Sequence, residues 1–199
     1  MNPTRRDFIK SASLLGAGAV FIPNMMSCSP SGRLNIAVIG VGGQGKSNWS
    51  KLINQKDPTW NENIVALCDV DTERMKGRIE SFKEKYPDKT VPYEFQDYKK
   101  MFAEIGDQID AVIIATPDHS HAIVTLYAMK LGKHVYCQKP LTHSVYESRM
   151  LTQAAEKYNV ATQMGNQGSS GDHTAWVCES IWNGDIGEIK EVHAWTNRP

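Results

Sequence analysis

Short apolar runs alternate with longer amphipathic stretches along the chain from Gly32 onward. The short runs are typical of buried strands, and the longer stretches repeat their apolar positions with the period of a helix. The predicted strands are 34–39, 64–68, 111–115, 134–137 and 160–164, and the predicted helices are 43–53, 72–85, 98–105, 122–131 and 144–158. This alternation predicts an α/β domain, a doubly wound parallel sheet, over residues 31–164.

The last part of the chain, residues 165–199, has a different pattern. A helix is predicted at 172–183 and a turn at 184–187, and polar and apolar residues then alternate over 189–195. A half-exposed strand of this kind is typical of an antiparallel sheet. Because one strand cannot bury its own face, we expect residues 165–199 to be the truncated start of a second domain of the α/β type, built on an antiparallel sheet.

The composition is that of a globular protein that handles small molecules. Of the 199 residues 41% are hydrophobic, and 22 basic and 22 acidic side chains give a formal net charge of zero. Such a chain has no long-range field that attracts nucleic acid, so we expect no nucleic-acid partner. No apolar run reaches the ~18–20 residues of a membrane-spanning helix, and no cluster of ligand residues has the spacing of a zinc site, so no metal is expected.

The N-terminal residues 1–30 have the pattern of an export signal. The pair Arg5-Arg6 precedes an apolar stretch from Leu14 to Pro23, an order typical of the twin-arginine route. We therefore leave residues 1–30 out of the fold and expect a periplasmic protein. Two fates of the signal remain open: plain cleavage, or lipidation of Cys28, which would anchor the protein to a membrane.

The other three cysteines have no spacing that indicates a function. Cys68 and Cys137 end predicted strands, and Cys178 lies in a predicted helix. Buried free thiols are the favoured interpretation, although an oxidising compartment would permit a disulfide.

A glycine-rich turn joins the first predicted strand to the first predicted helix. Its sequence is Gly40-Val41-Gly42-Gly43-Gln44-Gly45, a G-x-G-x-x-G motif in a strand–turn–helix context. Gly40 permits a tight turn, Gly42 lets the backbone approach a pyrophosphate, and Gly45 lets the helix pack close to the strand. The unpaired N–H groups of the helix N-terminus would face the phosphates. The turn predicts a Rossmann domain that binds a dinucleotide.

A carboxylate at the end of the second predicted strand bears on the choice of dinucleotide. Asp69 lies 24 residues beyond Gly45, close to the ~20-residue spacing of the acidic residue that binds the adenosine ribose. A carboxylate there repels a 2′-phosphate, so NAD is favoured over NADP. Asp71 is the competing candidate, but its position suits a helix cap. Arg74 would meet a 2′-phosphate or, in the favoured interpretation, lie in solvent.

Two further motifs occur at the ends of later strands. They are Ala115-Thr116-Pro117-Asp118-His119-Ser120-His121 and Tyr136-Cys137-Gln138-Lys139-Pro140-Leu141. Together with the glycine turn they resemble the Gfo/Idh/MocA family of NAD(P)-dependent oxidoreductases, over roughly residues 33–199. The resemblance implies that the strand ends line a nicotinamide crevice. The implied cofactor-binding residues are Gly40, Gly42, Gly43, Gln44, Gly45, Asp69, Thr116, Pro117, Asp118, His121, Gln138, Lys139, Asn166 and Gln167.

The resemblance also implies a catalytic residue. The family's Glu-Lys-Pro motif places its lysine beside nicotinamide and substrate, and this lysine corresponds to Lys139, followed by Pro140, which is often cis in relatives. Gln138 replaces the glutamate, so it can hydrogen-bond to the lysine but cannot hold it charged. Lys139 is expected to orient the substrate and to stabilise charge at the hydroxyl that becomes a carbonyl.

Several of these side chains have a second interpretation. His121 would contact the cofactor or simply pack at the start of its helix, and His119 is favoured as a loop residue. His143 is interpreted as the neighbour of a helix cap. Asn166 and Gln167 follow the last strand of the sheet, where relatives touch nicotinamide or substrate, but a polar turn without a ligand fits equally. Two tryptophans of the helix at 172–183 are favoured as packing residues, and they are Trp176 and Trp182.

The resemblance further implies a sugar or polyol substrate and a homo-oligomeric full-length protein. In relatives the general base comes from the C-terminal domain, at positions beyond Pro199. The 199-residue chain is therefore expected to keep a cofactor site but to show no dehydrogenase turnover. Three functions remain open: an NAD-dependent oxidoreductase acting on a sugar, cyclitol or glycoside, an NAD-dependent glycoside hydrolase or lyase, and an inert nucleotide-binding module.

Overall fold

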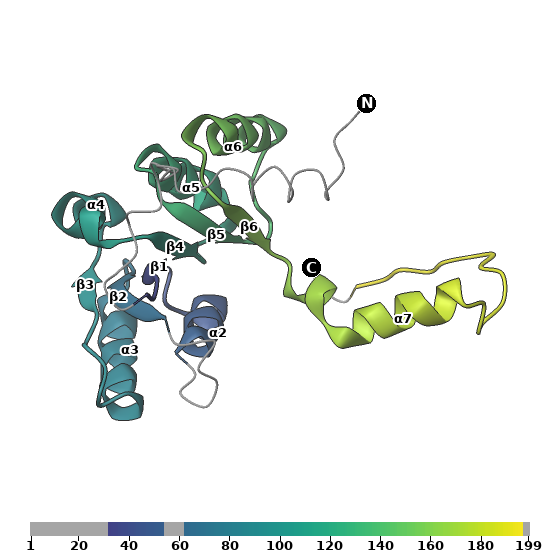
Figure 1. Ribbon diagram of the computed structural model, residues 1–199, viewed down its shortest axis with the longest axis horizontal. Helices are drawn as coiled ribbons and strands as arrows, with labels where there is room; N and C mark the ends of the chain where they lie inside the picture. Colours follow the sequence, from purple (N-terminus) through teal and green to yellow (C-terminus); the bar gives the residue numbers. More distant parts are fainter. Residues whose placement is uncertain (1–31, 54–61, 197–199) are drawn as a thin grey trace, which may run out of the picture.

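A computed structural model describes residues 32–53 and 62–196, so the expected export signal at residues 1–30 lies outside the described part. Six strands form one sheet in which every neighbouring pair is parallel. The strands are β1 (Asn35–Ile39), β2 (Asn63–Cys68), β3 (Tyr93–Phe95), β4 (Ala111–Ile114), β5 (His134–Gln138) and β6 (Thr162–Gly165). Their order across the sheet is β3-β2-β1-β4-β5-β6 (Figure 1).

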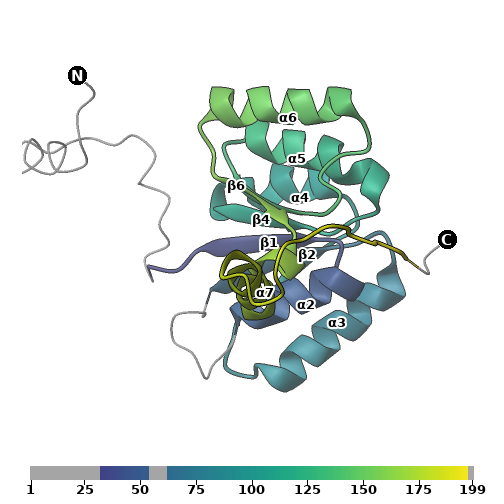
Figure 2. The ribbon, with the colours of Figure 1, turned by 90° about the vertical axis from the view of Figure 1, so that its right-hand side faces the viewer.

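Helices cover both faces of this sheet. They are α2 (Gly43–Leu52), α3 (Thr72–Lys85), α4 (Tyr98–Ile105), α5 (His121–Lys130) and α6 (Val145–Tyr158), followed by α7 (Asp172–Trp182) beyond the sheet. Figure 2 shows α2 and α3 on one face and α4, α5 and α6 on the other. The predicted doubly wound parallel sheet is confirmed, and its strand order reverses between β1 and β4, where such sheets bind ligands.

Two apolar clusters hold the helices on the sheet. Successive residues of β1 point to opposite faces, so Val38 packs with Trp49 and Phe82 on the side of α2 and α3. Its neighbour Ile39 belongs to the cluster on the other side, which includes Val124 of α5. Because both faces are buried, β1 has a continuous apolar sequence instead of an alternating one.

The edge strand β3 is absent from the sequence prediction. It has three residues, and Tyr93 and Glu94 are exposed. Its assignment comes from pairing with β2, in the register Ala66 with Tyr93 to Cys68 with Phe95. A segment this short has too little apolar periodicity to be recognised from sequence.

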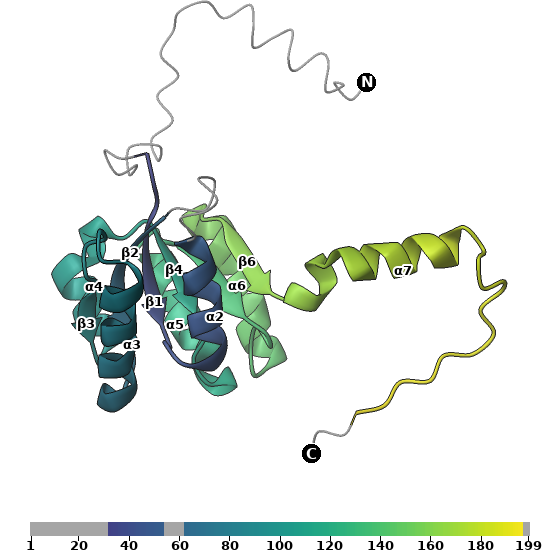
Figure 3. The same cartoon turned by 90° about the horizontal axis from the view of Figure 1, so that it is seen from below.

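The strand predicted at 189–195 is wrong, and with it the antiparallel sheet of a second domain is not seen in the described part of the chain. Residues 187–196 have no regular secondary structure. They follow α7, which projects away from the sheet (Figures 1 and 3). Val192 and Trp195 are largely exposed. The alternating pattern does not form a strand there because no neighbouring strand accepts its backbone hydrogen bonds.

No described helix combines the length and the apolar character that a bilayer crossing requires. Across residues 32–53 and 62–196, no group of three or more His, Cys, Asp or Glu side chains is arranged to hold a metal ion.

Candidate functional site

The glycine-rich turn leads from the end of β1 into α2 and is very tightly packed. Gly40 has a φ of +88°, in the region that favours glycine. A Cβ on Gly45 would lie 1.9 Å from the carbonyl oxygen of Gly40, and a Cβ on Gly40 would lie 2.5 Å from the carbonyl oxygen of Ala115. The predicted role of Gly45 in close helix–strand packing is therefore borne out by the geometry.

The N-terminus of α2 is left open for a ligand. Gly42 is its N-cap and supplies no side-chain hydrogen bond, and the first turn carries no acidic residue. Gly43 and Gln44 are exposed, and the first N–H groups of a helix have no partner within the helix. These amides and the positive end of the helix dipole suit the phosphates of a dinucleotide.

Asp69 lies beside this turn, at the end of β2, and its residue exposure is only 8%. Its carboxylate accepts hydrogen bonds from the backbone N–H of Val41, at 2.9 Å, and from that of Asp71, at 3.0 Å. Asp71 itself caps α3 by accepting from the N–H of Arg74, at 3.0 Å. The structure thus gives the two aspartates the separate positions that the sequence suggested.

Arg74 lies across the same corner of the site. Its guanidinium is 3.2 Å from the Asp71 carboxylate and 3.7 Å from that of Asp69, and its side chain is 48% exposed. A Cβ on Gly42 would lie 3.0 Å from the Arg74 Cδ. The side chain is therefore partly solvated, as expected, but it also packs on the glycine turn, a contact that the sequence did not reveal.

The residues at the ends of β1 and β2 fit the adenosine and pyrophosphate of a dinucleotide. The turn has no room for a Cβ at Gly45, α2 has an uncapped N-terminus, and a fixed carboxylate lies next to both. These are the three parts that a Rossmann site uses.

The turn after β4 carries the second motif. Asp118–Ser120 form a single 3-10 turn, whose Ser120 N–H donates to the carbonyl of Pro117 at 2.9 Å. Pro117 and Asp118 are exposed, while Thr116 is half-buried. Because the strands are parallel, this turn lies at the same edge of the sheet as the glycine turn.

His121 is the one buried side chain of this motif, with 1% exposure. Its Nδ1 lies 2.6 Å from the carbonyl oxygen of Pro140, and its Nε2 lies 2.8 Å from that of Thr116. Since both ring nitrogens face protein carbonyls, the geometry favours the packing interpretation over direct cofactor contact, which stays a prediction.

The third motif follows at the end of β5. Gln138 is 4% exposed, and its Nε2 has no hydrogen-bond partner in the structure. A Cβ on Gly165, its partner in β6, would lie 2.5 Å from that nitrogen. Lys139 is exposed at the same edge, and the Lys139–Pro140 peptide bond is cis. The lysine therefore has access to a bound small molecule.

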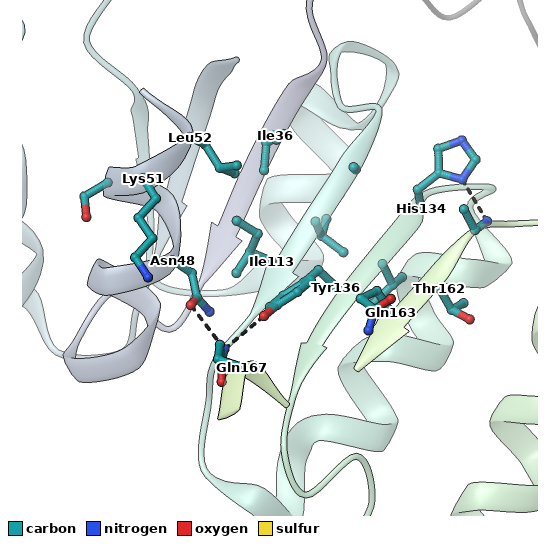
Figure 4. A pocket seen from close by; sticks show the side chains of 15 residues that line it. Ile36, Asn48, Lys51, Leu52, Ile113, His134, Tyr136, Thr162, Gln163 and Gln167 are labelled. Carbon is teal, nitrogen blue, oxygen red and sulfur yellow. Dashed lines mark hydrogen bonds between the residues drawn. The ribbon is translucent and has the colours of Figure 1, made fainter. Parts of the chain in front are cut away.

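Gln167 is one of two predicted residues that follow β6, and it joins three elements. Its Nε2 donates to the hydroxyl of Tyr136 at 2.9 Å and lies 3.5 Å from the Oδ1 of Asn48 (Figure 4). That Oδ1 also accepts from the Nε2 of Gln44, at 3.0 Å. Asn166 is exposed. The sequence did not single out Tyr136 or Asn48, and only the i,i+4 spacing of Gln44 and Asn48 gave a signal.

A cavity of about 950 Å³ lies beside this polar group, over the face of the sheet on the side of α2. Apolar side chains such as Ile36, Leu52 and Ile113 line it together with Tyr136. Asp69, Thr116 and Lys139 are not among its lining residues. Gln167, one of the predicted cofactor-binding residues, lines it together with Asn48, so the cavity borders the predicted cofactor site.

The thiols near the site are buried and hold their protons more tightly than a free cysteine does. Burial, with the negative charges of Asp97 and Asp69, raises the pKa of Cys68 to about 12, and burial raises the pKa of Cys137 to about 11. Both are free, as is the half-buried Cys178. The prediction of buried free thiols is confirmed for Cys68 and Cys137, whereas Cys178 is free but only half-buried.

Comparison with known proteins adds a family match over the same elements. Residues 34–166 match the model of a family described as "Oxidoreductase family, NAD-binding Rossmann fold". The chain is 30% identical over 164 residues to a protein of Solibacter usitatus named "Glycosyl hydrolase family 109 protein", covering 77% of this chain and 36% of that protein. It is 28% identical over 166 residues to an inositol 2-dehydrogenase of Rubrobacter xylanophilus, covering 83% of this chain and 44% of the relative.

A solved structure shows the same arrangement of elements. The crystal structure of myo-inositol 2-dehydrogenase from Lactobacillus plantarum superimposes with a TM-score of 0.65 at 28% identity, over 79% of this chain and 43% of that one. The chain thus spans less than half the length of these relatives.

Proposed function

The chain belongs to the Gfo/Idh/MocA family of NAD-binding oxidoreductases, and we propose that it binds NAD(H) and acts on a CH–OH group of a sugar, cyclitol or glycoside. The observation that carries this proposal is the hydrogen bond that places Asp69 beside the Gly40–Gly45 turn, an arrangement that would offer a phosphate site and a ribose site side by side. The inositol dehydrogenases among its relatives support the substrate class.

The chain's own residues would divide the binding between them. Amides of Gly43 and Gln44, at the uncapped start of α2, hold the pyrophosphate. The Asp69 carboxylate, already fixed by two backbone N–H groups, accepts hydrogen bonds from the adenosine ribose hydroxyls. Its charge repels a 2′-phosphate, and this supports NAD over NADP as the cofactor.

At the other end of the crevice, Thr116, Pro117 and Asp118 would lie along the nicotinamide half. When bound, NAD supplies a nicotinamide ring that takes a hydride from the carbinol carbon. The exposed Lys139 would donate a hydrogen bond to the substrate oxygen and stabilise the negative charge that develops there, while the hydroxyl proton would pass to a general base of the full-length protein, which the family resemblance places in the C-terminal domain. The residue before Lys139 is the buried, neutral Gln138 and not the glutamate of the family motif. Lys139 therefore has no carboxylate at the preceding position.

A second function is favoured by one observation, the 30% identity to a protein named for glycosyl hydrolase family 109. In this alternative a sugar carbon would be oxidised transiently by the bound NAD, the glycosidic bond would be eliminated, water would add across the resulting double bond, and the carbon would be reduced again by the NADH formed in the first step. A full-length protein that releases free sugar from a glycoside without net formation of NADH has the hydrolase activity. Net NADH formed with a polyol or sugar indicates the dehydrogenase.

We also propose that residues 1–30 direct export by the twin-arginine route, to the periplasm, and are then either cleaved off or anchored to a membrane by lipidation of Cys28. These residues lie outside the described part. Because that route carries folded proteins, the cofactor would be bound before export and retained, and the full-length protein, as a homo-oligomer, would recycle it.

Mass spectrometry of the native, unstripped protein tests the proposal. A retained dinucleotide with the mass of NAD(H) is expected, together with the length of the mature chain. Equilibrium dialysis that finds neither NAD nor NADP bound to folded protein contradicts the proposal.

A further inference from the structure

The hydrogen-bond ladder between β4 and β5 ends before the residues proposed to meet the nicotinamide. Its last pair is Ile114 with Cys137. Beyond that pair one segment enters the turn that begins at Thr116, and the other continues through Lys139 to Pro140. Some other contact must therefore fix the distance between the two segments.

The buried ring of His121 provides such a contact. Its two nitrogens lie 2.6 Å from the Pro140 carbonyl oxygen and 2.8 Å from the Thr116 carbonyl oxygen. Carbonyl oxygens only accept, so a neutral ring donates to one of the two and a doubly protonated ring donates to both. In every protonation state the ring donates at least one hydrogen bond to these segments, and it spans the gap that the ladder leaves.

We infer that His121 is a positioning residue for Lys139 and for the nicotinamide end of the crevice. The inference rests on the proposed function. One ring nitrogen lies 2.6 Å from the carbonyl oxygen of Pro140, which directly follows Lys139, and the other lies 2.8 Å from that of Thr116, so the ring sets the spacing between the lysine's backbone and Thr116. Because the ring is 1% exposed, it acts through these two segments and not by touching the substrate.

The position of His121 predicts a larger effect on the nicotinamide half of the cofactor than on the adenosine half. The adenosine and pyrophosphate contacts come from the Gly40–Gly45 turn and Asp69, which have no hydrogen bond to His121 among those described. ADP-ribose makes those contacts but has no nicotinamide. The ratio of NAD affinity to ADP-ribose affinity therefore separates a positioning role from general packing.

The test measures both affinities by calorimetry for the 199-residue chain and three variants. His121→Phe fills the space without a donor, and His121→Asn keeps a donor that reaches one carbonyl. His143→Asn replaces an exposed histidine and is the matched control. For His121→Phe we expect NAD affinity to fall about tenfold, the size of one lost hydrogen bond, with ADP-ribose affinity within about twofold of wild type. His121→Asn should lie between, and His143→Asn should match wild type.

Each other result has a defined meaning. Equal losses for NAD and ADP-ribose, or no loss of NAD affinity in His121→Phe, overturn the positioning role. Wild-type chain that binds neither ligand overturns the proposed function instead. If His121→Phe does not fold, hydrogen exchange of His121→Asn decides: faster exchange in residues 115–121 and 138–142, but not in 40–45, supports the inference, and unchanged exchange overturns it.

Discussion

The carboxylate of Asp69 accepts a hydrogen bond from the backbone N–H of Val41 across 2.9 Å. The residue proposed to bind the ribose therefore also fixes the glycine turn proposed to bind the phosphates. A second bond, from the N–H of Asp71 at 3.0 Å, locks the same carboxylate to the start of α3. The Asp69 side chain therefore contributes both to the proposed affinity for NAD and to the stability of the glycine turn.

Replacement of Asp69 should separate these two effects. Asp69→Asn keeps an acceptor but loses the charge, so we expect NAD affinity to fall about tenfold to a hundredfold. Asp69→Ala should in addition lower the free energy of unfolding by about 1–3 kcal/mol, because a buried N–H loses its acceptor. Calorimetry and urea unfolding measure the two quantities. Asp71→Ala is the control: it removes a helix cap at a cost of about 1 kcal/mol and should change NAD affinity little.

A methyl group at Gly45 should disrupt the site. Its Cβ would lie 1.9 Å from the Gly40 carbonyl oxygen, so α2 must move away from β1, at a cost of about 1–3 kcal/mol in stability. Loss of measurable NAD binding by Gly45→Ala is expected in equilibrium dialysis. The matched control is Gly77→Ala in α3, where a Cβ meets nothing within 4 Å. That variant should keep NAD binding and gain about 0.5–1 kcal/mol of stability. Normal NAD binding by Gly45→Ala would show that the turn does not hold the phosphates.

Removal of the Asp69 charge should also change the choice of cofactor. The Arg74 guanidinium lies 3.7 Å from that carboxylate and 3.2 Å from that of Asp71, so in Asp69→Ser it would keep one carboxylate partner and could turn its other N–H groups to a 2′-phosphate. We expect the ratio of NADP to NAD affinity to rise at least about tenfold, the effect of a charge-assisted contact. The double variant Asp69→Ser with Arg74→Ala should lose this gain. If the double variant keeps it, Arg74 has no part in the change.

Alkaline pH should weaken the fold through the buried thiols. The pKa of Cys68 is raised from 9.0 to about 12 and that of Cys137 from 9.0 to about 11. The folded state therefore binds these protons more tightly than the unfolded state, so the stabilisation is complete below pH 9 and is lost as pH rises towards 11 and 12. Urea unfolding at pH 8 and pH 10 measures the decrease. Substitution of both cysteines by alanine should reduce the loss of unfolding free energy between pH 8 and pH 10. An identical loss in that variant would mean that other groups cause it.

The elements around the site could be predicted because each depends on neighbouring residues alone. A continuous apolar run gave β1, the glycine spacing gave the turn, and Asp71 gave the start of α3, where its side chain accepts from the Arg74 N–H. The family resemblance then added the two later motifs. In each case the residues that determine the conformation lie within a few positions of one another.

What could not be predicted depends on contacts between distant segments. The short strand β3 exists because it pairs with β2, and the alternating residues at 189–195 form no strand because they have no such neighbour in the described chain. The sequence likewise placed Arg74 in solvent and left His121 with two roles. The contacts of Arg74 with Gly42 and of His121 with Pro140 join residues 32 and 19 positions apart, and local patterns do not encode them.

The packing of Trp49 gives this protein an internal fluorescent reporter. Trp49 is 2% exposed on α2, against Phe82, whereas Trp176, Trp182 and Trp195 are between 61% and 88% exposed. Iodide ions will quench the emission of those three exposed indoles but not that of Trp49. Trp60 lies outside the described residues, so the measurement uses a Trp60→Phe variant. In that variant, light emitted at high iodide concentration comes mainly from the helix whose first turn is proposed to meet the phosphates, and changes in its wavelength will follow the arrival of a nucleotide in real time.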